Sequence, residues 1–157
     1  MAELRPARAA DADAVGTIWA SAWRDGHFGH VPDELVAVRT PQSFLDRATQ
    51  RVPDTTVAEV DGVVAGFIMV DQDEVEQVFV DAGHRGSGVA AVLLAEAERQ
   101  VATGGHASAW LAVVEGNARA RRFYERRGWH DEGAFQYAAR HGDTTIPVPC
   151  RRYVKKV

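Results

Sequence analysis

Hydrophobic positions at helical spacing dominate the first third of the chain, after a short segment over residues 4–7 that is expected to be an opening strand. Asp11 or Asp13 is placed to cap a following helix, since a carboxylate accepts free backbone N–H groups at a helix start. That helix is expected to end near Gly26. Its inward stripe, at spacings of three and four, comprises Val15, Ile18, Trp19, Ala22 and Trp23. A second helix is expected over residues 41–51, with Phe44, Leu45 and Ala48 facing inward.

From residue 55 onward, β-branched and apolar residues indicate strands instead. Segments 55–60, 63–71 and 74–80 predict three consecutive antiparallel strands, and Asp61-Gly62 between the first two is a strong hairpin signal. A glycine-rich loop over 81–88 follows and opens directly into a helix. The inward residues of that helix are Ala90, Leu93, Leu94, Ala97 and Val101, and Gly104-Gly105 ends it.

The last third of the chain predicts one more helix between strands. Residues 108–114 form an apolar strand, and Asn117 is a favourable N-cap for a helix that ends at Gly128. Segments 129–137 and 144–154 are expected to be closing strands. This order predicts one α+β domain over residues 1–157, built on a single twisted sheet.

Composition restricts the class of protein. Of 157 residues, 46% are hydrophobic and 25% charged, which is typical of a folded globular chain. A net charge of −4 argues against nucleic acid as the main partner, and no segment reaches the roughly 18 apolar residues of a membrane span. The acidic N-terminal region is unlike a secretory signal, and the single Cys150 forms no internal disulfide. We therefore expect a cytoplasmic protein without a membrane segment.

The segment from Arg85 to Ala90 joins a strand to a helix, where backbone N–H groups meet the positive end of the helix dipole. A pyrophosphate is a natural ligand for such a loop, although a tight turn explains the same glycines. The P-loop is excluded because Val89-Ala90 stands where Lys-Ser/Thr is required, and the dinucleotide loop because position 91 is Ala.

Two motifs resemble those of the GNAT superfamily of N-acetyltransferases. The core R/Q-x-x-G-x-G/A of its acyl-CoA motif is matched by Arg85, Gly88 and Ala90. The stretch NARARRFYERRGW, residues 117–129, is similar to the family's N-x-x-A-x-x-F-Y-x-x-x-G-F, with Trp129 replacing Phe. The resemblance implies a mostly antiparallel mixed sheet of about seven strands, flanked by about four helices and splayed between strands 4 and 5.

The resemblance also implies how acetyl-CoA is bound as a cosubstrate, without a metal. A bulge in the fourth strand leaves backbone groups free for the pantetheine arm. Main-chain contacts to that arm are expected from Val78, Phe79 and Val80, and pyrophosphate contacts from Arg85, Gly86, Ser87, Gly88, Val89 and Ala90. Asn117 is either a helix cap alone or an additional cofactor contact.

Tyr124 and Glu74 are the expected catalytic residues. In the family, the tyrosine at this position is the general acid for the departing thiolate; otherwise Tyr124 is core like Phe123. A carboxylate at the start of the fourth strand often deprotonates the amine, which nominates Glu74. Glu76 lies two residues on and hence on the same strand face. Both acids could instead be solvated edge charges, with water serving as the base.

The segment from Trp19 to Pro32 resembles the W-R-x-x-Y-x-G-x-x-P variant of small bacterial members, with His27 in place of tyrosine. This region covers the acceptor pocket in that family, so His27, Phe28 and His30 are candidates to line it. No acid or cysteine spacing beside the two histidines supports a metal.

The expected activity is therefore acetyl transfer from acetyl-CoA to a primary amine by direct attack in a ternary complex. Cys150, far in sequence from the motifs, is not expected to carry the acyl group. The alternatives are a non-catalytic acyl-CoA sensor, which Tyr124 argues against, and an interaction domain whose glycine loop is only a turn. The sequence does not identify the acceptor, which is a small molecule or a peptide or protein amine, and a homodimer is one possible assembly.

Overall fold

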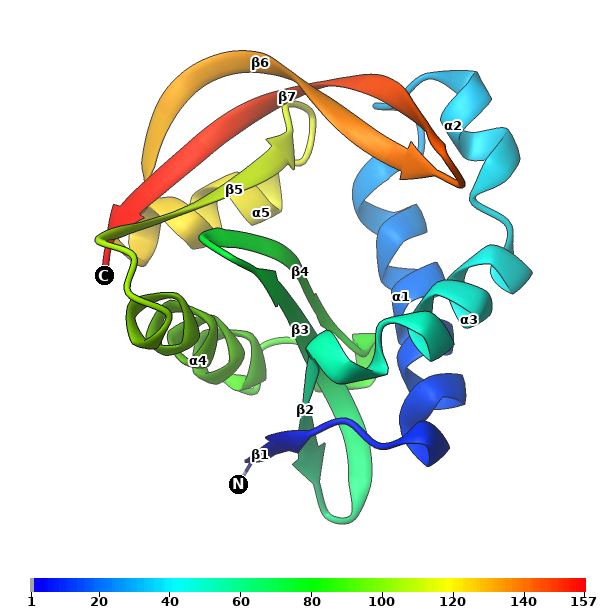
Figure 1. Cartoon of the computed structure of the whole chain (residues 1–157), viewed down its shortest axis with the longest axis vertical. Coiled ribbons are helices and arrows are strands. Elements are labelled where there is room, and N and C mark those ends of the chain that lie inside the picture. The colour runs from blue at the N-terminus through cyan, green and yellow to red at the C-terminus, as the bar shows by residue number, and fades with distance from the viewer. Residues whose placement is uncertain (1) are drawn as a thin grey trace.

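A computed structural model describes residues 2–157 as one seven-stranded sheet with helices on both faces (Figure 1). The strand order is β1-β2-β3-β4-β5-β7-β6. The strands are β1 (Glu3–Pro6), β2 (Thr55–Val60), β3 (Val63–Asp71), β4 (Glu74–Val80), β5 (Ser108–Val114), β6 (His130–His141) and β7 (Thr144–Lys156). The helices are α1 (Ala12–His27), α2 (Asp33–Val38), α3 (Pro41–Gln50), α4 (Val89–Thr103) and α5 (Ala118–Arg126).

The sheet is splayed between β4 and β5, the one neighbouring pair that runs parallel. Only Glu74 and Trp110 are in register there, whereas β5 and β7 are in register from Ser108 to Val114. The remaining neighbours are antiparallel. The α+β class, the seven strands and the splay between strands 4 and 5 are therefore confirmed.

The helices divide between the two faces of the sheet (Figure 1). Trp19 and Trp23 of α1 and Phe44 of α3 form a core with Phe67 and Met69 of β3. On the opposite face, apolar side chains of α4 and α5 pack against the sheet. Most of the predicted inward residues are therefore buried, but Ala22, Leu45 and Ala90 are only partly buried and lie outside both cores.

Two local features differ from the sequence expectation. The helix α2 was not predicted, because its six residues are too few for a visible period; Leu35 is its one buried side chain. Asp11 precedes α1 but its carboxylate does not cap that helix. It accepts hydrogen bonds from the Arg8 amide at 2.7 Å and from the Arg5 guanidinium at 2.7 and 3.0 Å. A hydrogen bond from a charged guanidinium is stronger than one from a backbone amide, so the Asp11 carboxylate bonds Arg5 instead of capping α1.

A bulge in β4 changes which residues face each side of the sheet. Met69 is in register with Gln77, and Val70 with Val75, so Glu76 is an additional residue in β4. Beyond the bulge, Phe79 packs with the α1–α3 core, while Val78 and Val80 pack toward α4. Because one added residue reverses the alternation, Phe79 joins Glu74 and Glu76 on one face.

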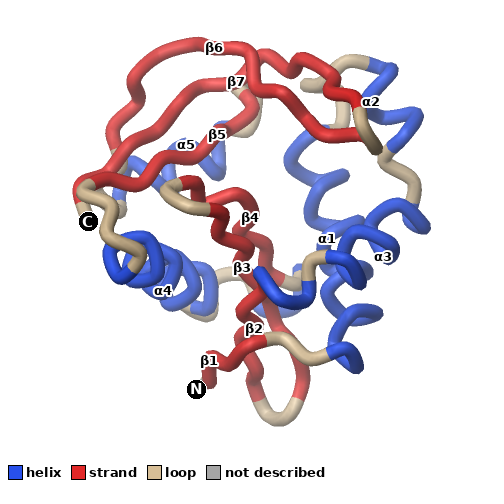
Figure 2. Tube along the Cα trace, in the orientation of Figure 1, coloured by secondary structure: helices blue, strands red, loops and turns tan. Residues whose placement is uncertain are grey.

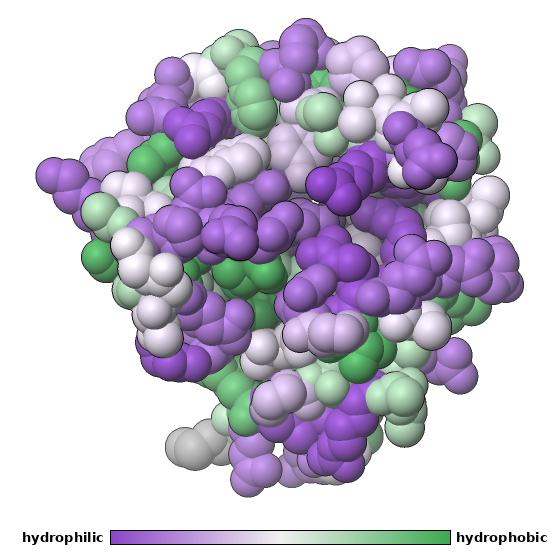
Figure 3. Space-filling view, viewed as in Figure 1, coloured by the Kyte–Doolittle hydropathy of each residue, from purple (hydrophilic) through white to green (hydrophobic). Residues whose placement is uncertain are grey.

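The β6–β7 hairpin curves away from β5 toward α2 (Figure 2). A hydrogen bond of 2.6 Å from the Arg39 guanidinium, just after α2, to the carbonyl of Arg140 in β6 joins the two. On the face in Figure 3, hydrophilic side chains predominate and apolar groups show between them in small areas. Within residues 2–157, no helix is long and apolar enough to cross a membrane.

Candidate active site

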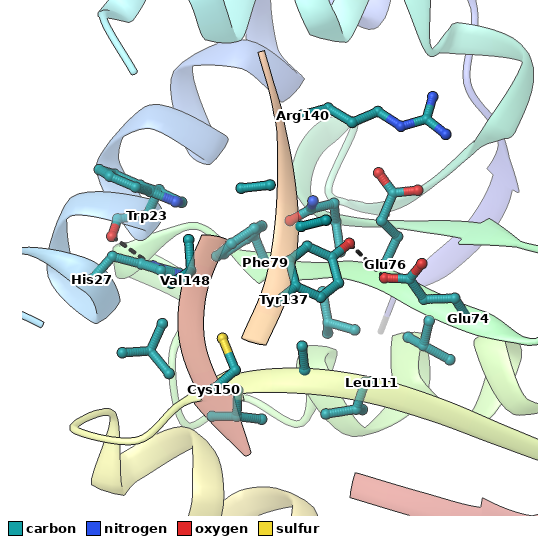
Figure 4. A pocket seen from close by; sticks show the side chains of 18 of the residues that line it. Trp23, His27, Glu74, Glu76, Phe79, Leu111, Tyr137, Arg140, Val148 and Cys150 are labelled. Atoms are coloured by element: carbon teal, nitrogen blue, oxygen red, sulfur yellow. Dashed lines mark hydrogen bonds between the residues drawn. The ribbon is translucent and has the colours of Figure 1, made fainter. Parts of the chain in front are cut away.

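A cavity of about 720 Å³ opens where β4 and β5 diverge. Its walls come from β4, β5, the β6–β7 hairpin, α1, α3 and α5 (Figure 4). Glu74 and Tyr124, the two expected catalytic residues, both line it, as do Val78, Phe79 and Asn117. The 117–129 motif reaches this cavity through Asn117 and Tyr124, whereas Val80 and the glycine-rich loop residues 85–90 do not line it.

Glu74, the first residue of β4, is half-buried in this cavity. Its carboxylate accepts a hydrogen bond of 2.6 Å from the Tyr137 hydroxyl, drawn as a dashed line in Figure 4. Burial raises the pKa of Glu74 above its usual value, and the bond from Tyr137 partly opposes that change. A carboxylate with a raised pKa is better matched to proton transfer near neutral pH.

Glu76 lines the same cavity but is held by a counter-ion. The Arg51 guanidinium bonds both of its carboxylate oxygens, at 2.6 and 3.0 Å. Neither acid is a solvated edge charge, because both side chains are at least half-buried and bonded. Glu74, whose partner is a neutral hydroxyl, remains free to change its protonation state.

Tyr124 lies on α5 in the other wall of the cavity, packed among aromatic rings. Its ring centroid is 5.3 Å from that of Phe123, 6.2 Å from Trp129 and 6.3 Å from Tyr153. Burial raises the pKa of its phenol, so the hydroxyl keeps its proton. A neutral hydroxyl at a cavity wall can donate a proton to a leaving group.

The glycine-rich loop lies at the N-terminus of α4, as the sequence predicted. Gly86 and Gly88 have φ of +78° and +89°, a region that L side chains rarely adopt, and a Cβ at either would meet nothing within 4 Å. The Arg85 guanidinium donates a hydrogen bond of 2.6 Å to the Asp25 carboxylate of α1, and the Ser87 hydroxyl donates to the carbonyl of His84. The amides of Arg85 and Ser87 already donate to the carbonyls of Ala82 and His84, at 3.3 Å each. Open space therefore adjoins the loop at Gly86 and Gly88, before α4 begins at Val89-Ala90.

The other expected cofactor residues lie close to the split in the sheet. Val78, Phe79 and Val80 pair with β3 on one side, but no residue of this segment is in register with β5. Asn117 caps α5, since its side chain accepts a hydrogen bond of 3.2 Å from the Ala120 amide. The capping half of the Asn117 expectation is confirmed, and its amide also lines the cavity.

The three residues suggested for the acceptor pocket separate in the structure. His27 lines the cavity; its Nδ1 donates to the Trp23 carbonyl at 3.0 Å, and burial lowers its pKa to about 4. Its ring stacks on Trp23 with centroids 4.9 Å apart. His30 packs against Gly116 outside the lining, and Phe28 is 55% exposed. Only His27 fits the expectation, as a neutral imidazole.

Cys150 is closer to the site than its sequence position suggested. Its thiol lies in the cavity wall (Figure 4), because β7 places it opposite Val114 of β5. Burial raises the pKa of this thiol to about 11. The reactive thiolate is therefore scarce at neutral pH, which agrees with direct transfer.

Several lining residues were missed in the sequence. Tyr137 is separated from Glu74 by 63 positions, and no local spacing connects them. Trp110 lines the cavity from β5 and donates to Asp73 at 3.2 Å. Arg47 could have been noticed, since it lies on the inward side of α3 beside Phe44 and Ala48. Among residues 2–157, no three His, Cys, Asp or Glu side chains group as metal ligands.

Comparison with known proteins identifies the family of the chain. The model of the Acetyltransferase (GNAT) family matches residues 15–129. An uncharacterized N-acetyltransferase of Mycobacterium bovis is 32% identical over 126 residues, which are 76% of this chain and 81% of that protein. The chain belongs to the GNAT family of acetyltransferases.

Solved structures share the fold at low sequence identity. A GCN5-related N-acetyltransferase from Rhodopseudomonas palustris superposes with a TM-score of 0.76 at 19% identity, over 100% of this chain and 96% of that one. A second structure is yncA of Salmonella typhimurium, a putative acetyltransferase solved with its cofactor acetyl-CoA. It superposes with a TM-score of 0.71 at 19% identity, over 99% of this chain and 94% of that one. These likenesses extend over the whole described fold.

Proposed function

We propose that this protein transfers an acetyl group from acetyl-CoA to a primary amine by direct attack. The observation that carries the proposal is the single cavity at the β4–β5 split, lined by Glu74 from one side and Tyr124 from the other. The family to which the chain belongs supports the reaction class, and the neighbour solved with acetyl-CoA supports the donor.

The residues present fit acetyl-CoA. The N-terminus of α4 adjoins the open space that Gly86 and Gly88 leave, and 78–80 is not in register with β5. We propose that the glycine loop binds the pyrophosphate, and that backbone groups of 78–80 bind the pantetheine arm as an added strand would. Acetyl-CoA supplies the acetyl group as a thioester.

In this proposal Glu74 takes the proton from the acceptor amine, directly or through water, and Tyr137 holds its carboxylate in place. Tyr124 gives its proton to the sulfur of the departing thiolate. The neutral phenol has a proton to give, and a positioned acid can neutralise the negative charge that develops on the departing sulfur. Cys150 stays outside the chemistry.

The test is release of CoA thiol from acetyl-CoA with a panel of amines, amino acids and peptides, together with calorimetry of CoA binding. We expect micromolar CoA binding and turnover with at least one acceptor class. CoA binding without turnover on any amine would favour the acyl-CoA sensor. Absence of CoA binding would remove both functions.

A further inference from the structure

One wall of the cavity carries a guanidinium without a counter-ion. Arg47 lies on the inward side of α3, and its guanidinium carbon is 4.2 Å from the Trp19 ring centroid and 5.7 Å from that of Phe44. Its Nη1 is shielded from solvent and has no hydrogen-bond partner among residues 2–157. Stacking on rings compensates the flat faces of a guanidinium but leaves its N–H groups unpaired.

A second unpaired group lies beside it. The Arg47 guanidinium stacks on the indole ring of Trp19. The Nε1 of that ring is also shielded from solvent and has no hydrogen-bond partner in the described chain. Arg47 and Trp19 both line the cavity. Both unpaired atoms are donors, and neither side chain can accept a hydrogen bond. Because both atoms are covered by protein, what this wall presents to the cavity is the positive charge of Arg47.

The charged side chains around Arg47 leave its positive charge without a counter-ion, which favours binding of an anion. Glu76, the acid that acts electrostatically on Arg47, already bonds Arg51 through both oxygens. Arg39 also lines the cavity, and its guanidinium bonds a backbone carbonyl rather than a carboxylate. Burial and the charge of Arg39 lower the pKa of Arg47 to about 9. Neither Arg47 nor Arg39 thus forms an ion pair with an acid among residues 2–157.

Glu74 occupies another part of the same cavity. Tyr137 connects the two regions, since its hydroxyl bonds Glu74 at 2.6 Å while it is close enough to interact electrostatically with Arg39 and Arg47. A molecule that fills this space meets a proton acceptor at Glu74 and the positive charge of Arg47, which forms no ion pair in the described chain. That arrangement is complementary to a molecule with an amine and an oxyanion.

We propose that the acceptor is an amine that also carries a carboxylate, as an amino acid does, and that Arg47, with Arg39, binds the carboxylate while the amine faces Glu74. This inference rests on the proposed acetyl transfer and narrows its substrate class. The planar fork of arginine matches a carboxylate in geometry and charge. Binding also removes the penalty of a buried, unpaired charge.

The test compares matched acceptors on wild type and on Arg47→Met, which keeps a long side chain over the Trp19 and Phe44 rings but removes the charge. The acceptors are the common amino acids, each paired with its α-amide. Arg47→Lys restores the charge if the Met variant folds poorly. Arg127→Met is the matched control, because Arg127 also stacks on a ring, that of Phe123, but does not line the cavity.

We expect the best amino acid to exceed its amide by at least tenfold in kcat/KM on wild type. In Arg47→Met that preference should fall close to one, mainly through a higher KM, with unchanged calorimetric affinity for CoA. Arg127→Met should retain the wild-type preference. Without acetyl-CoA, the preferred amino acid should raise the melting temperature of wild type but not of Arg47→Met.

Amides that are acetylated as well as their parent acids by wild type would overturn the proposal, and so would a preference for acids that persists in Arg47→Met. The melting-temperature measurement needs no turnover, so it tests the carboxylate site even if the assay fails. Transfer to carboxylate-free amines alone would leave the proposed function standing and remove this inference. Amino-acid binding without transfer to any amine would remove the proposed function and leave the carboxylate site.

Discussion

At the residue scale, Tyr124 is the side chain whose role follows least from packing. Its ring fits the aromatic cluster with Phe123, Trp129 and Tyr153, and phenylalanine would fill the same space. If Tyr124 served only to pack in this cluster, its hydroxyl would not be needed. Removing the oxygen alone therefore separates packing from chemistry.

Tyr124→Phe should lower kcat at least tenfold, because a positioned general acid contributes about 10²–10⁴-fold. KM for acetyl-CoA and the melting temperature should stay close to wild type, which is the signature of an interaction made only in the transition state. Steady-state kinetics with a working acceptor measures both. Tyr153→Phe is the control, since Tyr153 adjoins Tyr124 but does not line the cavity. Wild-type turnover by Tyr124→Phe, with chemistry rate-limiting, would make the tyrosine core.

Glu74 is the residue whose charge is most consequential for pH dependence. Its pKa is raised in the folded state, so the folded protein binds this proton more tightly than the unfolded chain does. Stability from this group is therefore present below the unfolded pKa of about 4.3 and is lost as pH rises through the folded value. Glu74→Gln removes that pH dependence and keeps an acceptor for the Tyr137 hydroxyl.

As pH rises through that window, wild type loses this stabilisation and Glu74→Gln does not. We therefore expect the free energy of unfolding of Glu74→Gln to increase relative to that of wild type, as urea unfolding at a series of pH values would measure. Its turnover should fall at least tenfold, because a general base contributes about 10²–10⁴-fold. The loss should be largest toward low pH, where more of the amine is protonated, as long as wild-type Glu74 is still ionised. A pH–rate profile that matches wild type would assign deprotonation to water.

At the element scale, most of the helices and strands could be predicted from local sequence. The Asp61-Gly62 turn, the glycine loop before α4, the Asn117 cap and Gly128 after α5 each depend on neighbours within a few residues. Such features are readable without the fold. The helix α2 was missed because one buried residue, Leu35, makes no period.

The lining of the cavity was only partly predictable, since it depends on contacts between distant elements. The motif residues Glu74, Tyr124 and Asn117 reach it because family resemblance carries long-range information. Tyr137 and Cys150 reach it through the curve of the β6–β7 hairpin, which no local pattern encodes. Their positions required the sheet order.

The glycine loop gives the prediction at this scale. Gly88→Asp adds a side chain and a negative charge where an anion is proposed to bind, so CoA affinity should fall more than tenfold, or roughly 1.4 kcal/mol. Gly105→Asp is matched to it, since Gly105 has a φ of +92° and an equally open Cβ position but follows α4 rather than preceding it. Calorimetry should find that only the Gly88 variant has lost CoA affinity. Equal affinity in both folded variants would remove the loop from the CoA site.

At the scale of the whole molecule, the sheet is two parts joined weakly in the middle. Strands β1 to β4 form one antiparallel part and β5, β7 and β6 the other, with only Glu74 and Trp110 in register between them. Helices and their cores hold the two parts together, because Val114 of β5 packs with α1 and α3 while Leu111 and Val113 pack with α4. A ligand in the split would add the contacts that the strands lack.

Bound CoA should therefore protect backbone amides on both sides of the split. Hydrogen exchange should slow for those amides of Val78, Phe79 and Val80 that do not bond β3, and for the facing amides of β5. CoA at 100 times its dissociation constant should also raise the free energy of unfolding by about 2.7 kcal/mol. Amides between β2 and β3 are the internal control, because they are already paired and should change only as far as global stability does. Slowing that spreads evenly over the sheet would mean that CoA stabilises the fold without joining β4 to β5.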